Sequence, residues 1–135
     1  MLEQAEFRFV HLTDTHIMVG GKWKARGGDF EFDTEASLRR VVAAVRTLEP
    51  APAFAVLGGD LASPDLIDRT RVLTPDDYEP SYRLLAEILA GLPCPVRFLV
   101  GNHDHRVAFN RVLRRNAPNQ TRRTITALTT RVTTL

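Results

Sequence analysis

Residues 9–16 read FVHLTDTH, and the same pattern returns at residues 54–60, FAVLGGD, and at residues 96–104, VRFLVGNHD. Each stretch starts with a short run of β-branched, aliphatic and aromatic residues, which is typical of a buried strand. Each run then passes into glycine, aspartate, asparagine or histidine. When strands run parallel, their carboxyl ends meet at one edge of the sheet. We therefore expect the three polar ends to lie together.

The polar ends carry side chains that suit a metal ion. Asp14 and His16 are two positions apart, so both point the same way from an extended backbone. Asp60 and Asn102 follow the other two strands. Oxygen and imidazole ligands without a thiolate favour divalent transition metals, which promote hydrolysis of phosphate esters. The sequence therefore predicts a hydrolytic metal site at this edge.

Helices are expected between the strands. Asp33 or Thr34 can cap the first, whose apolar stripe consists of Leu38, Val41, Val42, Val45 and Leu48. The second is expected to begin near Pro80 and to end at a glycine cap, Gly91, with a stripe of Leu84, Leu85, Ile88 and Leu89. A third is expected to start within residues 107–113, and residues 17–33 and 61–79 read as loops. This alternation predicts an α/β fold with parallel strands and right-handed crossovers.

The three polar ends resemble the motifs of the calcineurin-like metallophosphoesterases. These motifs are D-x-H at residues 14–16, G-D at 59–60 and G-N-H-D at 101–104. The first strand and its polar end look most similar to the branch with cyclic-nucleotide and glycerophosphodiester phosphodiesterases. The resemblance implies the N-terminal half of a four-layer α/β/β/α metallophosphoesterase sandwich. It also implies a phosphodiesterase in which a dinuclear metal-bound hydroxide cleaves a cyclic nucleotide or a glycerophosphodiester.

The resemblance assigns the metal ligands residue by residue. Asp14 and His16 bind one ion, Asp60 bridges both ions, and Asn102 binds the second ion without adding negative charge. Two divalent or transition metal ions are implied as cofactors, with Mn, Fe and Zn all compatible with the ligands. The implied partner is a phosphate-ester substrate.

The resemblance gives the next two residues a catalytic role. His103 contacts the phosphate and protonates the leaving alkoxide, and Asp104 orients the His103 imidazole. The family's later motifs, a single histidine and G-H-x-H, have no counterpart after His105. We therefore expect residues 1–113 to form an incomplete, N-terminal part of the metallophosphoesterase domain, and the 135 residues alone to turn over little substrate.

Residues 114–135 form an Arg/Thr-rich tail that differs from the rest of the chain. From residue 105 onward there are seven arginines and no acid, whereas residues 1–104 carry 11 basic and 16 acidic side chains. The abrupt change favours a truncated or frame-shifted coding sequence over a disordered terminus. Two alternatives to an active enzyme follow: an inactive remnant, and nucleic-acid binding through the basic tail. The second is weaker, because no aromatic side chain follows Phe109 to stack on bases.

Other features predict a cytoplasmic protein that does not enter a membrane. The single cysteine, Cys94, reads as a buried and inert thiol. No signal peptide is recognisable, and no apolar run approaches the about 20 residues that span a bilayer. His11 is expected to be a structural imidazole, and His105 to face solvent. Trp23 reads as part of a solvated loop, with contact to a substrate base as the alternative.

Overall fold

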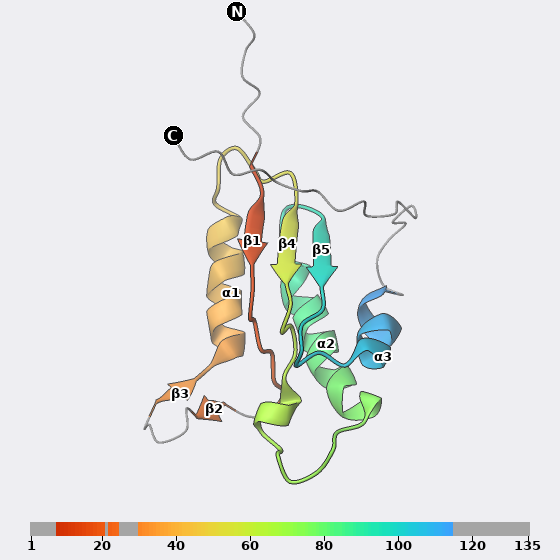
Figure 1. Ribbon diagram of the computed structural model, residues 1–135. Coiled ribbons are helices and arrows are strands. Elements are labelled where there is room, and N and C mark those ends of the chain that lie inside the picture. The colour runs from red at the N-terminus through yellow and green to blue at the C-terminus, as the bar shows by residue number, and fades with distance from the viewer. Residues whose placement is uncertain (1–7, 21, 25–29, 115–135) are drawn as a thin grey trace, which may run out of the picture.

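The computed structural model describes residues 8–20, 22–24 and 30–114. Its centre is a parallel sheet in the order β1-β4-β5 (Figure 1), formed by β1 (Val10–Leu12), β4 (Ala55–Gly58) and β5 (Val96–Leu99). The sheet is in register, with Leu12 beside Leu57 and Leu57 beside Phe98. The predicted α/β fold with parallel strands is confirmed. The tail at 115–135, with its four arginines, lies outside the described residues.

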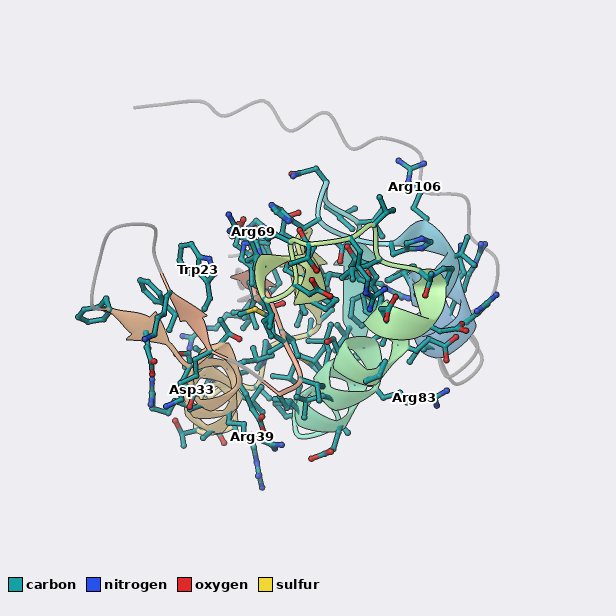
Figure 2. All side chains as sticks on the ribbon, turned by 90° about the horizontal axis from the view of Figure 1, so that it is seen from below. Trp23, Asp33, Arg39, Arg69, Arg83 and Arg106 are labelled. Atoms are coloured by element: carbon teal, nitrogen blue, oxygen red, sulfur yellow. The ribbon has the colours of Figure 1, made fainter. Side chains whose placement is uncertain are left out.

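Two helices connect the strands and cover one face of the sheet. Figure 2 shows α1 (Thr34–Val45) and α2 (Pro75–Leu89) on the same side of the strands. Strands added in one direction through right-handed crossovers place both helices on that side. Arg39 of α1 donates to Glu87 of α2 at 3.0 Å. The core between the helices and the sheet includes Leu38, Val42, Leu57, Tyr82, Leu85 and Ile88.

The helix α1 begins at the predicted cap. The carboxylate of Asp33 accepts a hydrogen bond from the backbone N–H of Ala36 at 2.8 Å. Of the predicted stripe, Leu38, Val42 and Val45 are buried. Val41 lies at the margin of that stripe and is partly exposed, and Leu48 lies beyond the end of the helix.

The helix α2 begins earlier than the sequence predicts. It starts at Pro75 rather than near Pro80, because Asp77 accepts from the backbone N–H of Thr74 at 2.7 Å and stabilises the first turn. Pro80 lies inside the helix, where the N–H that it lacks would have bonded to a carbonyl of the first turn. Gly91 directly follows the C-cap residue Ala90, where a glycine cap was expected, but its φ is not positive, so the left-handed cap is not formed.

The predicted third helix is present as α3 (Arg106–Phe109), which continues into a π-helical segment at Asn110–Arg114. Val112 and Leu113 are buried in the common core, as expected, but Val107 is 47% exposed. The helix therefore presents Ala108, rather than Val107, to the core.

Residues 17–33 contain a short hairpin that was expected to be loop. It pairs β2 (Trp23–Lys24) with β3 (Glu31–Phe32) in antiparallel fashion, and Trp23 lies opposite Phe32. Strands of two residues carry too little alternation to be recognised in a sequence. β3 leads directly into the cap of α1, so the hairpin is joined to the start of that helix (Figure 1). The second expected loop likewise contains a 3₁₀ turn, Pro64–Leu66.

The other face of the sheet is uncovered by any element of residues 8–20, 22–24 and 30–114. On this face Leu99 is 55% exposed and Phe9 is 55% exposed, and His11 is exposed between them in register. Parallel sheets usually bury both faces. Within the described part of the chain, no helix has both the length and the apolar character needed to cross a membrane.

Candidate metal centre

Three of the predicted ligands converge at the carboxyl edge of the sheet. Asp14, His16 and Asp60 each offer a ligand atom, and these atoms lie within 4.8 Å of one another. Backbone hydrogen bonds continue past the strand ends and hold the two segments together: Asp14 N–H donates to the Gly59 carbonyl, and His16 N–H to the Asp60 carbonyl at 2.9 Å. The convergence predicted from strand ends is therefore present for these residues.

All three side chains stand on left-handed backbone. The φ angles are 55° at Asp14, 41° at His16 and 47° at Asp60. Asp, Asn and His tolerate this region better than other side chains, but it still costs on the order of 1–3 kcal/mol per residue. Left-handed residues cluster at functional sites, because a sharp turn aims side chains that a regular strand would separate.

His16 has one ring nitrogen anchored and the other directed at the acids. Its Nδ1 shares a hydrogen bond of 2.7 Å with Oγ of Ser63, which is fully buried. Its Nε2 lies 3.7 Å from Oδ1 of Asp14. A hydrogen bond at one nitrogen fixes the tautomer and the ring orientation of a metal-binding histidine. This arrangement fits His16 as a ligand through Nε2.

The segment after β5 packs directly on Asp60. Oδ1 of Asp60 accepts from the backbone N–H of His103 at 3.0 Å. A Cβ atom at Gly101 would overlap Asp60, so only glycine allows this approach. Asn102 lies between these two contacts and is exposed. The fourth predicted ligand therefore sits at the same edge.

The carboxylate that holds His103 is Asp65, not the predicted Asp104. Nδ1 of His103 lies 2.7 Å from Oδ2 of Asp65. The His103 ring meets the His16 ring edge-on, with centroids 5.4 Å apart. His103 therefore stands beside the three ligands with its Nδ1 occupied by an acid.

Asp104 instead ties the loops of the site together. Its oxygens accept from the backbone N–H groups of Leu61 at 3.0 Å, Ala62 at 3.2 Å and Gly101 at 2.7 Å, and from the Tyr82 hydroxyl at 2.9 Å. A partly buried carboxylate needs such donors to offset its desolvation. We therefore correct the predicted contact between Asp104 and His103: Asp104 links the loop after β4, the loop after β5 and α2.

Two tyrosines of α2 lie behind these acids. Burial, followed by the nearby charge of Asp104, raises the pKa of Tyr82 far above its usual range. Burial also raises the pKa of Tyr78 to about 12, with a further contribution from the charge of Asp65. Both phenols thus remain neutral hydrogen-bond donors at neutral pH.

The remaining histidines differ from their predictions. His11 is exposed on the uncovered sheet face rather than satisfied inside the structure, and its ring approaches Gly58. His105 is partly buried against the Tyr78 ring, 5.3 Å between centroids, rather than facing solvent. Neither belongs to the three-ligand group.

A hollow of about 320 Å³ opens beside the ligands. It is bounded by polar groups of the centre and by apolar side chains of neighbouring elements, namely Asp14, His16, Met18, Trp23, Phe32, Thr34, Leu66 and His103. A volume of this size suits a small molecule.

The family follows from a comparison with known proteins. The profile of the calcineurin-like phosphoesterases matches residues 7–129. This chain belongs to the calcineurin-like phosphoesterase family. The parallel sheet and its helices are consistent with part of the metallophosphoesterase fold, and the Asp14, His16 and Asp60 group resembles a metal site.

Two curated relatives of this phosphoesterase carry similar names. A probable cyclic nucleotide phosphodiesterase of Rhodopseudomonas palustris is 35% identical over 102 residues, which is 76% of this chain and 31% of the relative. A probable cyclic nucleotide phosphodiesterase of a Pseudoalteromonas species is 31% identical over 104 residues, 76% of this chain and 33% of the relative. The chain thus spans about a third of the length of these relatives.

Two residues that support the candidate metal centre were missed in the sequence. Ser63 and Asp65 follow Asp60 by three and five positions, in a stretch read only as a polar connection. The available signal was their place directly after a ligand-bearing strand end. A 3₁₀ turn brings Asp65 beside His103, and no spacing of residues in the sequence predicts this turn. The partner of His103 therefore could not be chosen from sequence.

Proposed function

We propose that this chain carries part of the active site of a metal-dependent phosphodiesterase. The observation that carries the proposal is the convergence of Asp14, His16 and Asp60 on left-handed backbone, beside a histidine paired with an acid. The donors fit a divalent transition metal, because they combine carboxylate oxygens with one free imidazole nitrogen. Asp14, His16 and Asp60 would hold one ion, and Asp60 with Asn102 would contribute to a second.

The chemistry that such ions supply is Lewis acidity, which offsets phosphate charge and lowers the pKa of bound water. The protein's own contribution is positioning. Ser63 holds His16 through Nδ1, and backbone pairing aims Asp14 and Asp60 at the same point. These contacts fix the ligands before any ion arrives.

His103 is proposed as the acid that protonates the departing alcohol. Its Nδ1 is bound to Asp65, so its Nε2 is the nitrogen left for the substrate oxygen. The Asp65 carboxylate fixes the ring orientation. Asp65 is therefore a positioning residue in this proposal, and Asp104 supports the loops.

The substrate proposed is a phosphodiester such as a cyclic nucleotide, with a glycerophosphodiester as the alternative. The names of the two relatives support the first. Because this chain spans about a third of each relative, the reaction of the whole protein is proposed by relation to them.

Calorimetric titration with Mn²⁺ tests the metal centre. We expect Asp60→Asn to weaken Mn²⁺ binding by more than about tenfold. Loss of a residue that only hydrogen-bonds to a ligand already weakens metal binding by about tenfold or more, and Asp60 is a proposed ligand itself. His103→Ala is the matched control, because His103 touches Asp60 only through its backbone N–H. Equal losses in both variants would contradict the ligand assignment, and unchanged binding in Asp60→Asn would overturn it.

Hydrolysis of bis-p-nitrophenyl phosphate with Mn²⁺ tests the roles of His103 and Asp65. Where turnover is measured, we expect His103→Ala to abolish it. Asp65→Asn should lower kcat more than it raises KM, because the imidazole loses the carboxylate that fixes its orientation. A kcat equal to that of the parent protein would contradict the role of Asp65.

A further inference from the structure

An aromatic pair stands at the mouth of the metal centre. Trp23 and Phe32 face each other across the β2–β3 hairpin, with ring centroids 5.0 Å apart and planes inclined by 32°. Neither ring belongs to the core between the helices and the sheet. Phe32 contacts Trp23 and is still 41% exposed.

The aromatic pair and the metal ligands border the same space. Trp23 and Phe32 line the hollow of about 320 Å³ that Asp14, His16 and His103 also line. The lining of the hollow therefore combines charged and polar side chains with aromatic ones. A ligand that carries both a phosphate and a planar, apolar group matches such a lining.

The indole nitrogen of Trp23 adds a directed hydrogen-bond donor. Nε1 is buried and has no hydrogen-bond partner within the described part of the chain. A buried indole N–H usually finds an acceptor, because leaving it unpaired is unfavourable. The described residues therefore leave the polar edge of this ring unsatisfied, which packing within the hairpin does not explain.

Packing within the β2–β3 hairpin explains the position of Trp23 and Phe32 less well than ligand binding does. The hairpin already has its own ion pair, Lys24 with Glu31 at 3.2 Å, and the ring centroid of Phe30 lies 5.5 Å from that of Phe32. Phe30 is 71% exposed and does not line the hollow. In Figure 2 Trp23 lies on the side of the molecule where the loop bearing Arg69 also lies, away from Arg39 and Arg83 on the helices' outer side.

We infer that Trp23 and Phe32 form a stacking platform for the nucleobase of a nucleotide phosphoester. The inference rests on the proposed function, since it places the phosphate at the metal ligands. It deepens that proposal by favouring nucleotide esters over glycerophosphodiesters, which have no ring to stack.

The fluorescence of Trp23 reports on this platform directly, because it is the only tryptophan of the chain. We expect 5′-AMP to quench the emission of the full 135-residue chain saturably, and ribose 5-phosphate, which lacks the base, to leave it unchanged. Phe32→Ala should weaken the apparent affinity for 5′-AMP by about tenfold, within the range for loss of one base-stacking ring. Phe30→Ala is the matched control and should leave that affinity unchanged.

Further arms keep the test decisive. Phe32→Leu retains apolar volume without a ring and should weaken 5′-AMP binding as well, and far-ultraviolet circular dichroism confirms that each variant is folded. The fluorescence titration is repeated with adenosine on Asp60→Asn, which separates base stacking from metal binding. Quenching by adenosine in this variant upholds the stacking platform even where the metal proposal fails. Absence of saturable quenching by both 5′-AMP and adenosine, or equal affinity for 5′-AMP in folded Phe32→Ala and Phe30→Ala, would overturn the inference.

Discussion

Asp14 combines its proposed role as a metal ligand with an unfavourable backbone conformation. Its φ of 55° suits glycine better than any residue with a Cβ atom. We expect Asp14→Gly to leave the metal-free protein as stable as before or more stable by up to about 1 kcal/mol, whereas Asp14→Ala should destabilise it by about 1 kcal/mol. Both variants should bind Mn²⁺ more weakly, because both lack the carboxylate.

Urea unfolding of the metal-free proteins, followed by calorimetric Mn²⁺ titration, checks this expectation. Asp14→Asn serves as the control, because asparagine tolerates left-handed backbone almost as well as aspartate. Greater stability of Asp14→Ala than of Asp14→Gly would show that the backbone is not strained at this position.

At the residue scale, the sequence predicts the candidate metal ligands better than it predicts the residues that hydrogen-bond to the side chains of the site. Asp14, His16 and Asp60 converge because strand ends and parallel pairing bring them together, and both features are visible in the sequence. The partner of His103 depends instead on the path of a 3₁₀ turn. Asp104, adjacent in sequence, therefore looked like the partner of His103, while Asp65 has that contact.

At the scale of elements, Tyr82 fastens α2 to the loops of the site. Its hydroxyl donates to Asp104 at 2.9 Å and accepts from the backbone N–H of His105 at 3.0 Å. Tyr82→Phe should lower the free energy of unfolding by about 1.5–3 kcal/mol, the usual value for a hydrogen bond to a charged group. Urea unfolding at neutral pH measures this loss, and Arg83→Ala on the exposed side of α2 is the control.

The raised pKa of Tyr82 also gives the stability a pH dependence. As the pH rises above the ordinary phenol value of 10.0, the unfolded chain loses this proton while the folded protein keeps it. Stability should therefore be fully present below pH 10.0 and fall as the pH rises further, and Tyr82→Phe should show a shallower fall. Equal slopes in the two proteins above that pH would contradict the role of burial.

The errors among the elements have local causes. Pro80 suggested a helix start because proline favours the first turn, but Pro75 with Asp77 forms that start one turn earlier. The β2–β3 pair was missed because its strands have two residues each. Apolar periodicity predicted the buried faces of α1 and α2, since those faces depend on side-chain type alone.

At the scale of the whole molecule, the uncovered sheet face dominates the expected solution behaviour. Leu99 and Phe9 are exposed apolar side chains on a sheet of a kind that is normally covered on both sides, with His11 and Arg97 in the row between them. We expect the 135-residue chain to self-associate through this face, and Leu99→Lys to shift it toward the monomer. Size-exclusion chromatography with light scattering measures the change.

Val72→Lys is the matched control for this prediction. Val72 is 93% exposed on the connection before α2, so the same charge is added away from the sheet. Urea unfolding should show both variants within about 0.5 kcal/mol of the parent, as is usual for surface changes. Equal effects of the two substitutions on association would mean that the sheet face is not the contact.

The left-handed backbone at the metal centre has a consequence for how such a protein can change over generations. Asparagine accepts that backbone almost as readily as aspartate but carries no charge to attract an ion. A single base change in the codon of Asp14 or Asp60 produces it. One mutation can thus abolish metal binding while every strand, helix and loop stays in place. A homologue with the same fold can therefore lack the activity.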